Sequence, residues 1–154
     1  MRGALAFLLL SIAVTTVAVA ELSCGAAVED ISPPVGIPMA GYYHKRASTG
    51  VHDPLLARAL VLRQGDEKVA LVSLDLITTR RAFVQEARRL IEESTGIPAA
   101  KVMISATHTH TAPGLTGGRL YDTQGANEPL ALTYAQELPA KIAKAVKLAH
   151  SRLA

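Results

Sequence analysis

The fold is decided by one stretch of the sequence, 68-KVALVSLDLITTRRAFVQEARRLIEESTGIPAAKVMISAT-107. Its first eight residues form an apolar run that predicts a strand over 68–75. Its last seven are apolar on both faces and predict a buried strand over 101–107. Between the two, apolar side chains recur every 3.6 residues, which predicts a helix that stops at Gly96. The order strand, helix, strand predicts a right-handed crossover between parallel strands.

The segments before and after this unit extend it into a larger sheet with further helices. The run 55–63 predicts a strand, and only the turn residues 64–67 separate it from the strand at 68–75, so the two should form an antiparallel hairpin. A short strand is expected at 27–31 and a helix at 127–152. The predicted fold class is therefore α/β, a mixed sheet with a hairpin and a right-handed strand-helix-strand unit, flanked by helices.

The expected C-terminal helix is amphipathic but contains a proline. Pro139 removes one backbone donor and predicts a kink or a break at that point. The apolar face of the helix consists of Leu138, Ile142, Ala145, Val146 and Ala149. With no later element to pack on it, we expect part of this face to remain uncovered.

The N-terminus has the pattern of an export signal. Residues 1–20 carry one positive charge at Arg2, then an apolar stretch, then the small residues Ala18-Val19-Ala20 that a signal peptidase recognises. We therefore predict a signal peptide at 1–20, cleavage after Ala20, a mature domain at 21–154, and a secreted or periplasmic protein. Cys24 makes a lipoprotein the alternative, although the residues before it fit lipidation poorly.

The overall composition excludes little and points to no charged partner. The formal net charge is +3, from 16 basic and 13 acidic side chains, so a nucleic-acid partner is not indicated. Cys24 is the single cysteine, which rules out an intrachain disulfide. The oligomeric state stays open.

Two histidines follow the second strand of the crossover unit. His108 and His110 lie at its carboxyl end, where open α/β sheets place ligands. Residues at i and i+2 of extended backbone point to the same side, so both imidazoles could face one metal ion such as zinc. The alternative is that one histidine bonds to backbone at the strand end while the other points to water. The spacing alone leaves both readings open.

Other polar residues are weaker candidates for this site. The long connection 35–54 is interpreted as a wall of the site, because long connections are often functional. His52 and Asp53 are either a pair that orients a ligand or, more simply, a turn with a surface histidine. Asp75, at the carboxyl end of the first crossover strand, either accepts a hydrogen bond from an imidazole or ends its strand in water.

Four stretches together resemble a known family. They are DISPPVGIPMAGY (30–42), GVHDPLLARALVL (50–62), KVALVSLDL (68–76) and, most specifically, VMISATHTHTAPG (102–114). They resemble the N-terminal catalytic domain of the neutral/alkaline non-lysosomal ceramidases, and they span nearly the whole mature chain. One departure is Thr111-Ala112, where the family has Ser-Gly.

The resemblance implies a zinc-dependent amide hydrolase that splits ceramide into sphingosine and a fatty acid. It implies that His108 is a zinc ligand and that His110 handles a proton or polarises the substrate. It also implies a ceramide or related lipid amide as substrate, and it leaves contact with a membrane surface as an option. The family's remaining metal ligands lie downstream of this region, so we expect a truncated, incomplete enzyme. The alternative is a non-enzymatic exported α/β module or an inactive gene fragment.

Overall fold

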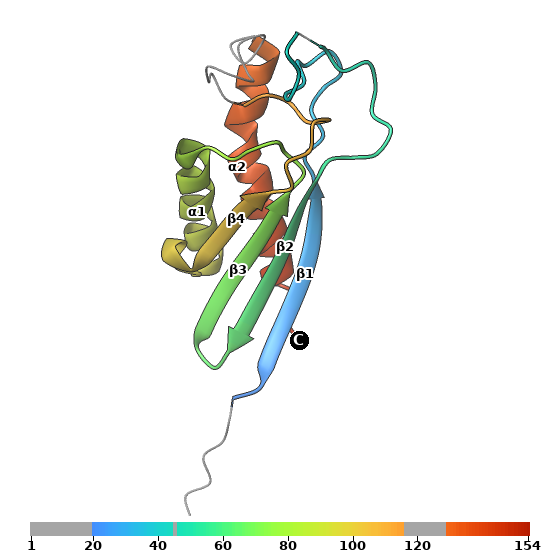
Figure 1. Ribbon diagram of the computed structural model, residues 1–154. Coiled ribbons are helices and arrows are strands. Elements are labelled where there is room, and N and C mark those ends of the chain that lie inside the picture. Colours follow the sequence, from blue (N-terminus) through green and yellow to red (C-terminus); the bar gives the residue numbers. More distant parts are fainter. Residues whose placement is uncertain (1–19, 45, 116–128) are drawn as a thin grey trace, which may run out of the picture.

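The described part of the chain folds into one mixed sheet and two long helices (Figure 1). The structure is a computed structural model that describes residues 20–44, 46–115 and 129–154. The predicted signal peptide, except for Ala20, and the first two residues of the helix expected at 127–152 lie outside the described residues. The elements are β1 (Leu22–Asp30), β2 (Leu56–Gln64), β3 (Glu67–Leu74), α1 (Arg81–Thr95), a short 3-10 turn (Ala99–Lys101), β4 (Val102–Ala106) and α2 (Pro129–His150).

The strands lie in the order β1-β2-β3-β4. β2 and β3 form the expected antiparallel hairpin, and β3 pairs in parallel with β4, as the strand-helix-strand order predicts. β1 pairs antiparallel with β2 along its whole length, from Leu22 opposite Gln64 to Asp30 opposite Leu56. It begins five residues before the expected strand at 27–31, because pairing with β2 recruits small and polar residues that carry no strand pattern of their own.

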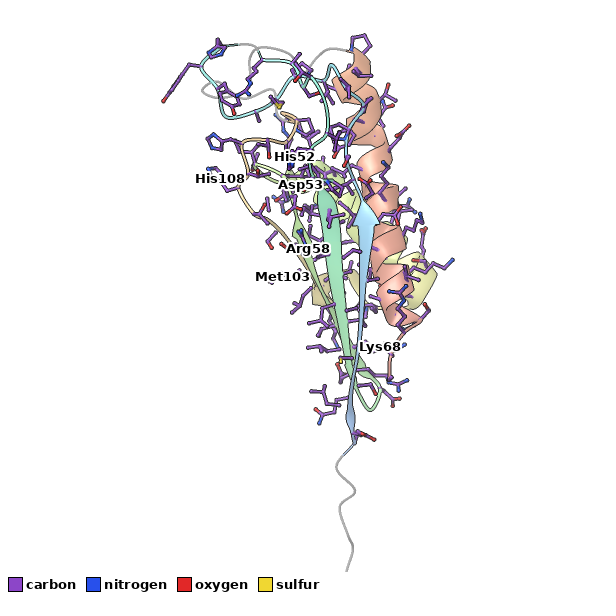
Figure 2. All side chains as sticks on the ribbon, turned by 90° about the vertical axis from the view of Figure 1, so that its right-hand side faces the viewer. His52, Asp53, Arg58, Lys68, Met103 and His108 are labelled. Atoms are coloured by element: carbon purple, nitrogen blue, oxygen red, sulfur yellow. The ribbon has the colours of Figure 1, made fainter. Side chains whose placement is uncertain are left out.

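Both helices cover the same face of the sheet (Figure 2). Alternate strand residues on that face, among them Ala59, Val61 and Val72, are buried with α1 and α2 in a single core. The apolar face of α2 is buried there as well, so the expectation that part of it lacks cover is wrong. The other sheet face has no covering element among the described residues.

α2 runs through Pro139 without a break. Pro139 and Leu138 are buried, as is Ile142 one turn later. Packing on both sides of the proline thus outweighs the one backbone hydrogen bond that it removes. Of the two outcomes predicted for Pro139, a kink or a break, the break is wrong. None of the helices in the described part of the chain has the length and hydropathy that a membrane crossing requires.

The start of β1 is in close backbone contact with the end of α2. The amide and carbonyl of Cys24 exchange hydrogen bonds with those of Ala154, at 3.1 and 3.2 Å. At the other end of β1, the buried Tyr134 hydroxyl donates to the carbonyl of Ile31 at 2.6 Å. α2 is therefore fixed to β1 at both ends.

Candidate functional site

The site is built where the two parallel strands end. β3 ends at Leu74 and β4 at Ala106, and these two residues are register partners. The segments that follow stay joined, because the amide of Thr107 donates to Leu74 O and the amide of His108 to Leu76 O, each at 2.9 Å. The histidine loop is therefore held by backbone hydrogen bonds to the chain after β3.

The imidazole of His108 has a fixed orientation. Its Nδ1 lies 2.8 Å from the carbonyl oxygen of Ile77. A carbonyl can only accept, so the proton is on Nδ1 and the Nε2 lone pair is left for a ligand. The backbone of His108 has φ 64, in the left-handed region. Non-glycine residues rarely adopt this conformation, and they concentrate at functional sites.

The ring of His110 lies next to that of His108. Their centroids are 5.4 Å apart and the planes meet at 76°. The expectation that the two imidazoles share one side is met, but the reason given for it is wrong. β4 ends before either histidine, and the left-handed residue His108 interrupts the extended backbone. The loop, and not strand alternation, brings the rings together.

His110 also rests on the long connection at 35–54. Its ring centroid is 6.4 Å from that of Tyr42, edge-on. A Cβ on Gly41 would lie only 2.4 Å from Nδ1 of His110, so the ring occupies the space that a side chain would need. Gly41 has φ +85, which glycine adopts without steric cost.

The connection itself is more ordered than the sequence suggested. Gly36 N donates to Ser48 O, Ser48 N to Ile37 O, and Met39 N to Arg46 O, which closes a short hairpin. The hairpin is joined to the histidine loop by Ala40 N donating to Ala112 O at 2.9 Å. The interpretation of this segment as a wall of the site agrees with these contacts.

A cavity of about 290 Å³ lies beside the histidine loop, between the hairpin and the start of β2. Tyr42 and Thr111, which flank His110, contribute to its lining, and so do His52 and Asp53. Nδ1 of His52 is 2.9 Å from a carboxylate oxygen of Asp53, and these side chains are 97% and 87% exposed. They form a solvated pair, as the simpler of the two interpretations says.

Asp75 fits neither of its two predicted roles. Its carboxylate accepts hydrogen bonds from Nη1 of Arg58, which lies 2.8 Å from each of the two oxygens. One of these oxygens also accepts from the amide of Leu56 at 3.0 Å. Burial opposes ionisation of this carboxyl, but the hydrogen bonds from Arg58, Leu56 and Thr107 and the positive charge of Arg58 outweigh it, so its pKa lies below the usual value. Asp75 therefore ties β2 to Thr107, the residue before His108.

Asp75→Asn is expected to destabilise the chain by about 1.5–3 kcal/mol at pH 7, the range for hydrogen bonds to a charged group. Because the folded pKa is depressed, the carboxylate contributes stability above its unfolded pKa of about 4, and this contribution is lost as the pH falls through the folded pKa. The gap between wild type and variant should therefore shrink from pH 6 toward about pH 2 in urea unfolding.

The control for this prediction is Asp53→Asn, at an exposed carboxylate. It should leave stability unchanged within about 0.5 kcal/mol at every pH. A pH-independent gap for Asp75→Asn would show that the substitution acts through shape and not through charge.

The donors present suit part of a metal site. His108 offers Nε2 while its Nδ1 donates to a backbone carbonyl, the arrangement usual for metal-binding histidines. Within the described ranges, no group of three or more His, Cys, Asp or Glu side chains is placed to hold a metal ion. The two histidines therefore fit zinc as a partial ligand set.

Sequence reasoning missed several residues that build the site. Gly41 and Tyr42 lie almost seventy residues before His110, and no local pattern connects them to it. The Ile77 carbonyl that orients His108 is a backbone atom, which leaves no trace in residue type. The sequence feature that could have pointed to Gly41 and Tyr42 is the Gly-Tyr pair itself, which lies inside a long connection.

Comparison with known proteins shows to which family residues 22–154 belong. The family model described as neutral/alkaline non-lysosomal ceramidase, N-terminal, matches residues 22–154. Among solved structures, the neutral ceramidase from Pseudomonas aeruginosa is similar, with a TM-score of 0.71 and 22% identity over 87% of this chain. A ceramidase complexed with C2 gives the same TM-score with 23% identity over 87%.

These likenesses concern the fold and cover only part of each relative. The chain spans 22% of the length of each of these two solved proteins. No curated protein is similar enough to this sequence to count as a match.

Proposed function

The chain belongs to the neutral/alkaline non-lysosomal ceramidase family, and from this premise we propose that it forms part of a zinc-dependent amide hydrolase. In this proposal His108 is a zinc ligand and His110 acts beside it on the substrate. The remaining ligands come from polypeptide outside the described residues.

The observation that carries the proposal is the hydrogen bond from Nδ1 of His108 to Ile77 O. It fixes the ring orientation and the tautomer, and it leaves Nε2 available to bind a metal ion. A histidine that only ended the strand would not need a left-handed backbone to present a free Nε2. Zinc, when bound there, supplies a Lewis acid that polarises a carbonyl and lowers the pKa of water.

His110 is placed to act on the group that reacts. Its ring lies 5.4 Å from that of His108, close enough for both to reach one small group. We assign to it proton transfer with the substrate amide, or a hydrogen bond to the amide oxygen as charge develops there. Gly41 and Tyr42 confine the ring, so little reorganisation is needed during the reaction.

The substrate that we propose is ceramide or a related lipid amide. Support comes from the family, and from a solved relative that is a ceramidase complexed with C2. A lipid substrate brings the enzyme to a membrane surface, so membrane contact is part of the same proposal. The alternative is a non-enzymatic exported module, favoured by the absence of a third metal-binding side chain among the residues described.

Zinc titration of the chain tests the proposal. With two imidazoles and no further ligand, binding should be weak, in the high micromolar range or weaker, since zinc sites normally use three or four protein ligands. The histidine Nε2 resonance of His108 should shift in nitrogen-15 NMR as zinc is added, and hydrolysis of a fluorescent ceramide analogue should be absent.

His108→Ala should abolish zinc binding in the titration. His52→Ala, at an exposed histidine, should leave zinc binding intact. No shift at His108 in millimolar zinc would refute the ligand assignment and favour the non-enzymatic module. Tight, stoichiometric zinc with turnover that His108→Ala removes would contradict the incomplete-site proposal instead.

The proposal also includes export. The apolar leader ending in Ala18-Val19-Ala20 should direct a fused reporter out of a bacterial cell, with cleavage leaving Glu21 as the first residue. Mass spectrometry of the exported product determines its first residue directly. An intact leader would contradict the cleavage site, and a lipid on Cys24 would make the chain a lipoprotein.

A further inference from the structure

The histidine loop is held by a short segment of chain, residues 74–77, where β3 ends. Leu76 O accepts from the amide of His108 at 2.9 Å and from the amide of Thr109 at 3.2 Å. Ile77 O accepts from Nδ1 of the His108 ring at 2.8 Å. These acceptors are backbone carbonyls of the segment 74–77, so the direction of the imidazole depends on where this segment lies.

The backbone of His108 has to be held in place from both sides. Within the described part of the chain, His108 is the only residue besides glycine with a left-handed backbone, φ 64. A non-glycine residue in this region is strained, and it persists only where its surroundings hold it there. On the C-terminal side, the amide of Thr109 supplies such a contact. On the N-terminal side, the contacts come from Thr107.

One carboxylate joins the segments that meet at this point. The amide of Asp75 donates to Leu56 O at 3.0 Å, and the amide of Leu56 donates back to the Asp75 carboxylate at 3.0 Å. The hydroxyl of Thr107 donates to the same carboxylate. Asp75 therefore fixes two things to β2, the segment that carries the acceptors and the residue that precedes His108.

Arg58 and limited solvent access strengthen these contacts. Nη1 of Arg58 lies 2.8 Å from each carboxylate oxygen, and the Asp75 side chain is only 17% exposed. Hydrogen bonds to an ionised acceptor are stronger than neutral ones, and they gain further where water competes less. Figure 2 shows Arg58 and His108 on the same side of the sheet. The carboxylate is thus a charge-balanced anchor beneath the histidine loop.

We propose that Asp75 is a positioning residue of the metal site, which acts on His108 through Thr107. It holds the backbone of His108 in the conformation in which the ring Nδ1 meets Ile77 O and Nε2 is left for a metal ion. Arg58 balances the charge of the carboxylate and fixes its orientation. The assignment of a metal ion to Nε2 rests on the proposed function, whereas the control of the ring rests on the contacts alone.

The alternative is that Asp75 contributes only to the stability of the fold. A purely stabilising contact would change the melting temperature when it is weakened, but the ring of His108 would keep its orientation and its tautomer. The tautomer of a neutral imidazole is set by the hydrogen bonds of its two nitrogens. It therefore distinguishes a positioning role from a stabilising one.

Thr107→Val tests the link most directly, because it removes the hydroxyl and keeps a branched side chain at an exposed position. Nitrogen-15 NMR at about pH 8, where imidazole is neutral, reports which ring nitrogen of His108 carries the proton. In the wild type this should be Nδ1. In the variant, the ratio of the Nδ1–H form to the Nε2–H form should fall by about tenfold, since a hydrogen bond to a charged group is lost.

Three further variants make this test specific. Thr107→Ser keeps the hydroxyl and should restore the wild-type ratio. Asp75→Asn should lower the ratio as Thr107→Val does, and the double variant should lower it no further than Asp75→Asn alone, because both act through one link. Thr133→Val is the matched control. Its hydroxyl donates to Pro129 O at 3.0 Å on α2, so the ratio should stay unchanged.

Zinc titration of the same proteins separates this inference from the proposed function. The zinc concentration that half-shifts the His108 resonance should rise by about tenfold in Thr107→Val, since fewer molecules present the competent conformation. Thr107→Ser should bind as the wild type does. A wild type that binds no zinc would refute the proposed function, and the tautomer ratio would then decide the role of Asp75 alone.

Two results would overturn the positioning role. The first is a tautomer ratio that Thr107→Val leaves at the wild-type value, and the second is a wild type whose His108 proton lies on Nε2. Wild-type zinc affinity in Thr107→Val would likewise reduce Asp75 to a stabilising contact. If Asp75→Asn does not fold, Thr107→Val and Thr107→Ser decide by themselves.

Discussion

Gly41→Ala is expected to lower the free energy of unfolding by about 2–5 kcal/mol and to displace the imidazole of His110. A Cβ at this position would lie 2.4 Å from Nδ1 and 2.5 Å from Cγ of His110, far inside contact distance. The backbone there has φ +85, so alanine also incurs a left-handed strain of about 1–2 kcal/mol. Urea unfolding measures the first effect, and the side-chain NMR resonances of His110 report the second.

Gly36→Ala separates the two contributions to this effect. Gly36 also has a left-handed backbone, φ +94, but a Cβ there meets nothing within 4 Å. It should cost only the backbone strain of about 1–2 kcal/mol and leave His110 unmoved. Equal losses for the two variants would show that the ring does not press on Gly41.

A double-mutant cycle sharpens the Gly41 test. In a His110→Ala background the imidazole is gone, so Gly41→Ala should cost about as little as Gly36→Ala. The coupling energy between positions 41 and 110 should therefore be about 1–3 kcal/mol, the range for overpacking at a filled site. If His110 acts on the substrate as proposed, displacement of its ring by about 1 Å should lower turnover by roughly a hundredfold.

The fold was predictable from the sequence where local patterns determine it. The two turn residues Gly65 and Asp66 specify the hairpin of β2 and β3, and a strongly amphipathic segment specifies α1. Both signals are local, so no tertiary information is needed to read them. The stop of α1 at Gly96, in the left-handed conformation, is of the same kind.

Elements that depend on tertiary contact were predicted less well. The first half of β1 is a strand because β2 pairs with it, and residues 22–26 show no strand pattern. Pro139 remains inside α2 because the helix is packed on the sheet on both sides of the proline. In each case a long-range contact outweighs a local preference.

The candidate site also has a part that the sequence predicts and a part that depends on tertiary contacts. The sequence placed His108 and His110 at the carboxyl end of a parallel strand, and the structure puts them there. It could not show that Asp75 pairs with Arg58, because that pair joins β2 to the end of β3 across the sheet. Nor could it show that Gly41 lies against His110, since that contact forms only when the hairpin at 36–48 folds onto the histidine loop.

Gly25→Ala is expected to destabilise the chain by about 3 kcal/mol or more, the upper end of overpacking costs. Gly25 lies on β1 where the end of α2 crosses it, and a Cβ there would be 2.1 Å from the carbonyl oxygen of Ala149. Two more backbone atoms, Arg152 C and Leu153 N, would lie at 2.9 Å. Backbone atoms cannot rotate away as a side chain can, so the last turn of α2 must lift off the sheet.

That movement has consequences beyond the clash. Lifting the helix end exposes Ala149, which is fully buried, and breaks the paired hydrogen bonds between Cys24 and Ala154. The melting temperature should fall by about 10 °C or more, at roughly 4 °C per kcal/mol for a domain of this size. Hydrogen exchange at the amides of Cys24 and Ala154 should accelerate more than exchange in α1, because the damage is local to the contact of β1 with α2.

Gly50→Ala is the control, since a Cβ there meets nothing within 4 Å, and it should leave stability within about 0.5 kcal/mol of wild type. A Gly25→Ala protein as stable as Gly50→Ala would mean that the end of α2 does not rest on β1.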